Sequence, residues 1–176
     1  MKFEKISIEQ WEKDLKKYTS YEKDEDVKST YENIKIPTRG SEYSAGYDFY
    51  IPYDFTLSSS KRDVILTGIR WNCENENALP NFESINYVLL LFARSSVAKE
   101  CGFSLINKVG VIDYDYYMAV NEGHIMIIVD RKTAKTDYAF KTGDRIVQGV
   151  ITQFHTVEND IVLNTKRTGG FGSSGK

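Results

Sequence analysis

The sequence predicts an all-β fold with an added N-terminal helix, and three observations lead to that class. Short runs rich in Val, Ile, Tyr and Phe recur between turn signals from Tyr31 onward. No helical period separates these runs, which is typical of a β-sandwich or β-barrel. Tyr87–Ala93 is continuously apolar, as expected of a strand buried on both faces. A separate helical pattern covers Ser7–Tyr18.

The helix over Ser7–Tyr18 is predicted from its cap and its period. Ser7 and Gln10 form a capping-box pattern at its start. Its apolar residues lie three or four positions apart, at Ile8, Trp11, Leu15 and Tyr18. The helix could bind a partner protein, but the pattern favours docking on its own domain or on a neighbouring subunit. The charged residues Glu22–Lys28 predict a mobile connector after it.

The strands and loops of the remaining chain follow from the same patterns. We expect strands near residues 31–36, 47–51, 63–70, 86–93, 103–112, 124–129, 145–154 and 160–163. Residues 72–86 are polar and contain Pro80, which predicts a long surface loop. The chain is therefore expected to contain an N-terminal helical extension (1–30), a β-rich core (31–165) and a flexible glycine-rich C-terminal arm (166–176).

The composition fits one globular domain without a dominant charged surface. Of the 176 residues, 41% are hydrophobic and 27% charged, and 23 Lys and Arg residues stand against 25 Asp and Glu residues for a net charge of −2. This balance argues against stable binding to nucleic acid or to a membrane. No stretch approaches the roughly 20 apolar residues of a membrane span, and the charged N-terminus does not resemble a secretory signal.

The cysteines and histidines favour an intracellular protein without a zinc site. Cys73 and Cys101 are too few for a disulfide framework, so both are expected to be reduced, in the cytoplasm or in a host cytoplasm if the chain is viral. His124 and His155 do not lie at metal-ligand spacing from other candidate ligands, and each is expected to be structural.

The stretch Gly110–Tyr116 is the centre of the candidate site. It is expected to form a strand, a tight turn carrying Asp113 and a second strand, with Tyr116 three residues after the carboxylate. Such a hairpin can present backbone N–H and C=O groups to a flat polar ligand while Asp113 faces a pocket. The alternative is an ordinary hairpin with a solvated tip, since a single short motif carries little weight.

Two further polar residues are candidates for a nucleotide site. Asp48 follows Gly46 and Tyr47 at the start of a strand, and its carboxylate could hold Mg²⁺ through water. Asn107 precedes Gly110 by three residues, and its amide can both donate to and accept from the edge of a base. The alternatives are a solvated turn for the first residue and a self-satisfied loop for the second.

Phosphate ligands are expected directly after the buried strand and on a later one. Arg94 offers a guanidinium fork, and Ser95 and Ser96 offer hydroxyl and N–H donors, although the same pattern can be a simple helix N-cap. Gln148 lies at the end of the motif Gly143–Gln148, where its amide could reach a phosphate.

The C-terminal residues Arg167–Lys176 are predicted to form a flexible arm. Gly170–Lys176 matches part of a P-loop, but no helix follows, so that interpretation is rejected. The glycines cost too much backbone entropy for the arm to fold alone. It could close over a nucleotide or remain disordered. Closure would use the following residues for stacking or phosphate contact: Phe171, Gly172, Arg167, Ser173 and Ser174.

Taken in order, five motifs resemble those of the trimeric dUTPase (deoxyuridine 5'-triphosphate nucleotidohydrolase) family. They are AGYD, RSSVAK, NKVGVIDYDY, GDRIVQ and RTGGFGSSG, and they span Ala45–Gly175. The resemblance implies a jelly-roll-like β-barrel subunit and a homotrimer. It also implies three active sites shared between subunits, each closed by a C-terminal arm.

The resemblance further implies hydrolysis of dUTP to dUMP and pyrophosphate with Mg²⁺, which limits uracil incorporation into DNA. Asp113 would hold and deprotonate the water that attacks the α-phosphorus, and Tyr116 would pack under the deoxyribose. Asn107 and the backbone near Gly110 would read uracil, and Asp48 would support the hydrated metal. The triphosphate would be held by Arg94, Ser95, Ser96, Gln148, Arg167, Ser173 and Ser174.

Departures from the family pattern leave alternatives open. Residues 117–122 precede Gly123, where the family reaches a glycine within two residues, so the hairpin is expected to be extended. The N-terminal helix and the 72–86 loop are additions that could be decoration or could bind a regulatory partner. The related dCTP deaminase shares the fold, but the stretch Gly110–Tyr116 argues against it.

Overall fold

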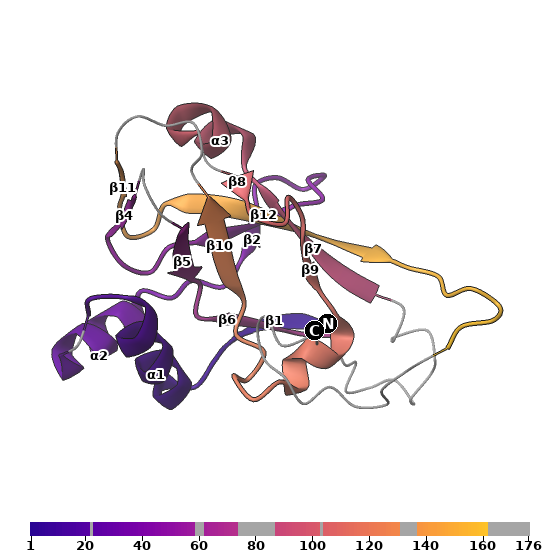
Figure 1. Ribbon diagram of the computed structural model, residues 1–176, viewed down its shortest axis with the longest axis horizontal. Coiled ribbons are helices and arrows are strands. Elements are labelled where there is room, and N and C mark those ends of the chain that lie inside the picture. The colour runs from indigo at the N-terminus through magenta and orange to yellow at the C-terminus, as the bar shows by residue number, and fades with distance from the viewer. Residues whose placement is uncertain (22, 59–61, 74–86, 103, 131–136, 162–176) are drawn as a thin grey trace.

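The computed structural model describes residues 1–21, 23–58, 62–73, 87–102, 104–130 and 137–161 (Figure 1). These residues form a mostly β structure with the α-helices α1 (Ile8–Tyr18), α2 (Asp24–Glu32) and α3 (Ser95–Cys101) and the 3-10 helix η2 (Tyr114–Met118). The strands are β1 (Lys2–Lys5), β2 (Thr38–Arg39), β3 (Tyr47–Tyr50), β4 (Phe55–Leu57), β5 (Arg62–Leu66), β6 (Ile69–Asn72), β7 (Tyr87–Ala93), β8 (Ser104–Leu105), β9 (Gly110–Ile112), β10 (Met126–Asp130), β11 (Tyr138–Phe140) and β12 (Arg145–Gln153). The predicted β-rich class is confirmed.

The strands pair into a large sheet and three smaller ones. The largest has five strands in the order β2-β3-β12-β7-β9, and a three-stranded sheet has the order β5-β10-β8. Two-stranded sheets join β1 to β6 and β11 to β4, and the pairings are antiparallel. The described strands therefore form separate sheets rather than a closed barrel, and the predicted jelly-roll barrel stays a prediction.

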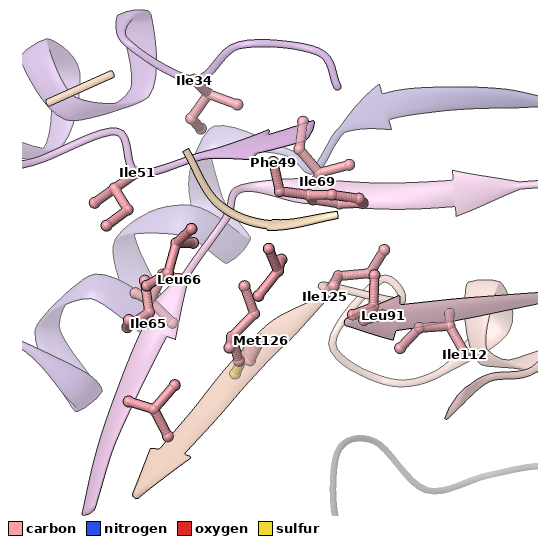
Figure 2. Close-up of a cluster of buried hydrophobic side chains, with 14 of the residues drawn as sticks. Ile34, Phe49, Ile51, Ile65, Leu66, Ile69, Leu91, Ile112, Ile125 and Met126 are labelled. Atoms are coloured by element: carbon pink, nitrogen blue, oxygen red, sulfur yellow. The ribbon is translucent and has the colours of Figure 1, made fainter. Parts of the chain in front are cut away.

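One hydrophobic core lies between the two larger sheets (Figure 2). Phe49 of β3 and Leu91 of β7 share this cluster with Leu66 of β5 and Met126 of β10. Within the five-stranded sheet, β12 carries Gly149, where a Cβ atom would lie 2.8 Å from Leu89 Cδ1 and 2.9 Å from Phe49 Cε2. The glycine therefore lets the apolar side chains of the neighbouring strands meet across β12.

Most predicted strands are present, and two of them are divided by turns. The strand expected at 63–70 ends at Leu66 and resumes at Ile69, because Gly68 between them has a positive φ of 71°. The strand expected at 103–112 is divided into β8 and β9, which belong to different sheets, by a turn that contains Lys108 at a φ of 64°. No strand occurs at 160–161, and residues 162–163 lie outside the described chain.

The prediction for residues 22–36 was wrong, because this region contains helix α2 rather than a connector and a strand. Three acidic residues in the first turn suit the positive end of a helix. Val27 and Thr30 are buried, and the Trp11 indole N–H donates to the Thr30 hydroxyl at 3.0 Å. Tertiary packing against α1 therefore overrides the strongly polar local sequence of α2.

The predicted N-terminal helix is present as α1 and docks on its own domain. The Ser7 hydroxyl caps it by accepting the Gln10 N–H at 3.1 Å. Trp11 and Leu15 are fully buried, and each such side chain stabilises the fold by about 1.5–3 kcal/mol. Ile8 is 39% exposed and lies off the docked face.

Two polar residues on the buried face of α1 connect it to the segment before β10. Asp14 accepts hydrogen bonds from the Gln10 amide at 2.8 Å and from His124 Nδ1 at 2.7 Å. The Gly68 backbone N–H donates to His124 Nε2 at 2.9 Å, so that nitrogen carries no proton and Nδ1 does. Burial lowers the pKa of His124 in spite of the opposing effect of Asp14. The ring is therefore a neutral structural link.

Within the described ranges, no helix combines the length and the apolar character that crossing a membrane requires.

We predict that His124 makes the folded protein less stable as the pH falls. The unfolded histidine takes up a proton near pH 6.5, whereas the folded ring resists it because its pKa is lowered. The free energy of unfolding should therefore fall below about pH 6.5, by at most about 1.4 kcal/mol per pH unit from this group. Urea unfolding between pH 8 and pH 5 would measure this slope, and His124→Gln should reduce it. Equal slopes for both proteins would contradict the prediction.

Candidate active site

Three motifs that are far apart in the sequence meet at one end of the five-stranded sheet. Asp48 of β3 lies directly opposite Gln148 of β12, and Gln148 lies opposite Phe92 of β7. Arg94 follows the last residue of β7, and its N–H donates to the Ile146 carbonyl at 3.2 Å. The strand pairings thus bring these polar side chains together.

A bulge in β12 adds Arg145 to this group. Residues 145 and 148 would lie on opposite faces of a regular strand, because side chains alternate with a period of two. In this sheet Arg145 pairs with Tyr50 and Gln148 with Asp48, since the register shifts between Arg145 and Val147. One extra residue is absorbed there, and both polar side chains lie on the same face. Sequence reasoning treated Arg145 as structural and did not predict its contact with Asp48, because a register shift has no simple sequence signal.

Asp48 is the electrostatic centre of the group. Its Oδ1 lies 2.9 Å from Arg94 Nε, and its Oδ2 lies 3.1 Å from Arg145 Nη1. The Asp48 side chain is 10% exposed, whereas the side chains of Arg94 and Arg145 are 23% and 47% exposed. The carboxylate therefore holds two guanidinium groups in place, and parts of both remain open to solvent.

Space for Gln148 comes from the glycine of the first motif. A Cβ atom on Gly46 would lie 2.6 Å from Gln148 Oε1, so the glutamine amide rests against this glycine. The glycine thus removes a steric obstacle beside the predicted phosphate ligand.

The predicted serine donors begin helix α3. Ser95 and Ser96 are exposed in its first turn, directly after Arg94 at the N-cap position. The first backbone N–H groups of a helix have no carbonyl partner inside it. They could therefore serve an anion beside Arg94.

Asp113 follows β9, an edge strand of the described sheet, and the second strand predicted after it was wrong, because the 3-10 helix η2 begins at Tyr114. Asn107 is exposed in the turn before β9, and Asp113 is exposed directly after it. β9 pairs with β7 on one side, and Gly110 permits close approach, because its Cβ would lie 3.1 Å from Leu91 Cβ. A flat base could meet the other backbone edge of this strand.

Tyr116 lies inside the protein, which differs from the open position that the sequence suggests. The residue is 3% exposed, and its hydroxyl donates to the His124 carbonyl at 2.8 Å. The Asn121 amide donates to the same hydroxyl at 3.0 Å. Tyr116 therefore anchors the turn after Asp113, and its predicted contact with a deoxyribose stays a prediction.

Asp113 and the arginine group lie at opposite ends of β7. Ile112, which precedes Asp113, pairs with Leu89, whereas Arg94 lies five residues further along the chain. Asp113 lies one residue further from Arg94 than Ile112 does, so at about 3.3 Å per residue this register separates the two groups by roughly 20 Å. In Figure 1, α3 lies at the top and η2, the salmon-coloured helix next to the N label, lies near the bottom. One chain alone therefore cannot place both groups on the same phosphate.

The structure does not favour Asp48 as a metal ligand. Both of its oxygens face guanidinium groups, which compete with a hydrated cation. The described residues contain no cluster of three or more His, Cys, Asp and Glu side chains that could hold a metal ion. The role predicted for Asp48, which is to hold hydrated Mg²⁺ through water, stays a prediction.

Five predicted ligands lie outside the described residues: Arg167, Phe171, Gly172, Ser173 and Ser174.

Known proteins are similar to this chain in both sequence and fold. A family model described as dUTPase matches residues 32–175. The deoxyuridine 5'-triphosphate nucleotidohydrolase of Lactococcus lactis is 36% identical over 154 residues, which cover 85% of this chain and 95% of the relative. A protein of the same name from Paramecium bursaria Chlorella virus 1 is 33% identical over 153 residues, or 85% and 96% of the two chains. The crystal structure of dUTPase from Streptococcus mutans has a TM-score of 0.65 and 30% identity, and the match covers 90% of this chain and 99% of that one.

We predict that Asp48→Asn destabilises the fold. The variant leaves two adjacent, partly exposed guanidinium groups without their shared carboxylate, and loss of one partner of a partly buried charged hydrogen bond costs about 1–3 kcal/mol. Urea unfolding would measure the change. Glu12→Gln is a matched control, because its exposed pair with Lys16 is expected to contribute less than about 1 kcal/mol. Similar small losses for both variants would contradict the importance of the Asp48 pair.

Proposed function

We propose that this chain, which belongs to the dUTPase family, hydrolyses dUTP to dUMP and pyrophosphate. In this reaction water attacks the α-phosphorus. The chain is a dUTP diphosphatase, as the curated relatives with this activity in their names support. The observation that carries the finer proposal is the exposed Asp113 beside the open edge of β9. In the cell this activity would limit incorporation of uracil into DNA.

Asp113 is proposed to hold and deprotonate the attacking water. Its carboxylate is exposed at the start of η2, and its backbone carbonyl accepts the Tyr116 N–H at 3.2 Å. The side chain therefore projects from a turn that the backbone hydrogen bond restrains. The uracil base would lie along β9, between Asn107 and Asp113, and meet the backbone edge near Gly110.

The phosphate end of the site is proposed to use the arginine group. Arg94, Ser95, Ser96 and Gln148 converge at one end of the sheet, and Asp48 orients Arg94. Charged donors fixed before the reaction stabilise the charge that develops on the phosphates. Arg167, Ser173 and Ser174 are proposed to complete this set, with Phe171 and Gly172 against the base and sugar.

A complete site requires more than one copy of the chain. Because Asp113 and Arg94 lie roughly 20 Å apart along β7, the Arg94 group that meets one Asp113 would come from another subunit. A closed symmetric ring supplies such contacts to each subunit equally. This geometry supports the predicted homotrimer with active sites at the subunit interfaces.

Magnesium is proposed to enter as part of the substrate, the Mg²⁺ complex of dUTP. Mg²⁺ keeps several waters and binds phosphate oxygens readily, so it need not take a ligand from Asp48. The bound ion would neutralise part of the triphosphate charge.

Pyrophosphate release from dUTP, UTP, dCTP and dTTP, measured side by side with Mg²⁺, tests the function. We expect rapid turnover of dUTP and much slower turnover of the other three. Absence of dUTP turnover would overturn the proposal, and deamination of dCTP would favour the related enzyme of the same fold. Light scattering of the same sample tests the trimer, and a monomer with full activity would overturn the shared site.

We predict that Asp113→Asn lowers the turnover number for dUTP by about 10²–10⁴-fold, because an amide cannot accept the proton of the attacking water. Binding of dUTP should persist, since the change removes no phosphate ligand, and isothermal titration would measure it. Asp160→Asn, an exposed change in another turn, is the control. Full turnover in the Asp113 variant would contradict the proposed base.

A further inference from the structure

We propose that Glu122 and Ser7 form a positioning pair, through which the N-terminal segment holds the turn that carries Asp113. This inference rests on the proposed function and assigns to residues 1–8 a part in the same site. The N-terminal segment precedes the part of the chain that the dUTPase model matches, which begins at residue 32. Its contacts with residues 117–124 are therefore the evidence for the proposal.

The Glu122 carboxylate makes two hydrogen bonds to Ser7. The Ser7 backbone N–H donates to Oε2 at 2.8 Å, and the Ser7 hydroxyl donates to Oε1 at 2.6 Å. The same hydroxyl accepts the Gln10 N–H at the start of α1. The carboxylate thus lies at the positive end of a helix, where hydrogen bonds and the helix dipole both favour its negative charge.

Glu4 makes a second contact from the N-terminal segment to the same loop. The Tyr117 hydroxyl donates to Glu4 Oε2 at 3.1 Å, and the Arg70 guanidinium lies 4.6 Å from the centre of the Tyr117 ring. Glu4 and Arg70 are register partners in the β1–β6 sheet, and their side chains form an ion pair at 3.1 Å. The loop is therefore held by strand β1 as well as by the start of α1.

The loop in turn closes on Tyr116. Glu122 and Gly123 have positive φ angles of 57° and 69°, which turn the chain back toward η2. A Cβ atom on Gly123 would lie 2.8 Å from the Tyr116 carbonyl oxygen, so the returning backbone presses against this residue. Asn121 and the His124 carbonyl complete the contact through the Tyr116 hydroxyl.

These contacts reach Asp113, the proposed base, through Tyr116. Its carbonyl accepts the Tyr116 N–H, so movement of Tyr116 shifts the turn from which the Asp113 carboxylate projects. Glu122 is a non-glycine residue in the left-handed region, a strained conformation for a residue with a side chain. Its carboxylate contact with Ser7 offsets that strain.

The test uses Glu122→Gln, Ser7→Ala and the double variant in the full chain. Displacement of a catalytic group by about 1 Å can cost roughly 100-fold in rate, so we expect kcat for dUTP to fall about tenfold in each single variant. KM should change little, because neither residue touches the substrate. The double variant should be no slower than the single variants, since both remove the same contact. Ser7→Thr, which keeps the hydroxyl, should restore kcat.

Hydrogen exchange of residues 114–123 provides a readout that does not depend on activity. We expect faster exchange there in Glu122→Gln and in Ser7→Ala, measured well below the melting temperature, and unchanged exchange in Glu12→Gln, an exposed control on the same helix. If Glu122→Gln does not fold, Tyr117→Phe removes the second contact more gently and should also speed exchange.

The outcomes separate this inference from the proposed function. Wild-type turnover of dUTP with unchanged kcat and unchanged exchange in the variants would overturn the positioning pair and leave the function intact. A wild-type protein without dUTP turnover would overturn the function, and the exchange data would still decide whether Ser7 holds the loop. Faster exchange at unchanged kcat would overturn the link from the loop to Asp113.

Discussion

The pairing of β12 with β3 on one side and β7 on the other is the constraint on which the candidate site depends. It places Gln148 opposite Asp48 and brings Arg94 to the same end of the sheet. The bulge near Arg145 then allows one carboxylate to hold two guanidinium groups. Because Gly149 lets Phe49 and Leu89 meet across β12, the hydrophobic core and the polar group depend on the same strand.

The length of β7 keeps Arg94 and Asp113 of one chain apart. Arg94 lies at one end of this strand and Asp113 near the other, so the proposed phosphate ligand and the proposed base lie at opposite ends of one sheet. In the proposed assembly a neighbouring copy would bring its own arginine group to Asp113, so that the site is shared between subunits. In this proposal, assembly of the subunits therefore completes the active site and does not only stabilise the protein.

The N-terminal segment is integrated into the fold. α1 buries Trp11 and Leu15, and Asp14 connects it to His124. The apolar face of the helix is covered by its own domain, which removes the main reason to regard it as a docking helix for another protein. Through Glu4 and Ser7 the segment instead reaches the loop behind Tyr116.

The sequence by itself determined the β-rich class, helix α1, the long apolar strand β7 and the motifs that identify the family, because these depend on local periodicity, capping and residue order. It misjudged α2, whose polar residues become helical through packing of Val27 and Thr30 near Trp11. It also could not predict the Arg145 contact, which depends on a one-residue shift between strands, or the burial of Tyr116. These features were decided by tertiary structure, because each depends on residues that are distant in the chain and adjacent in space.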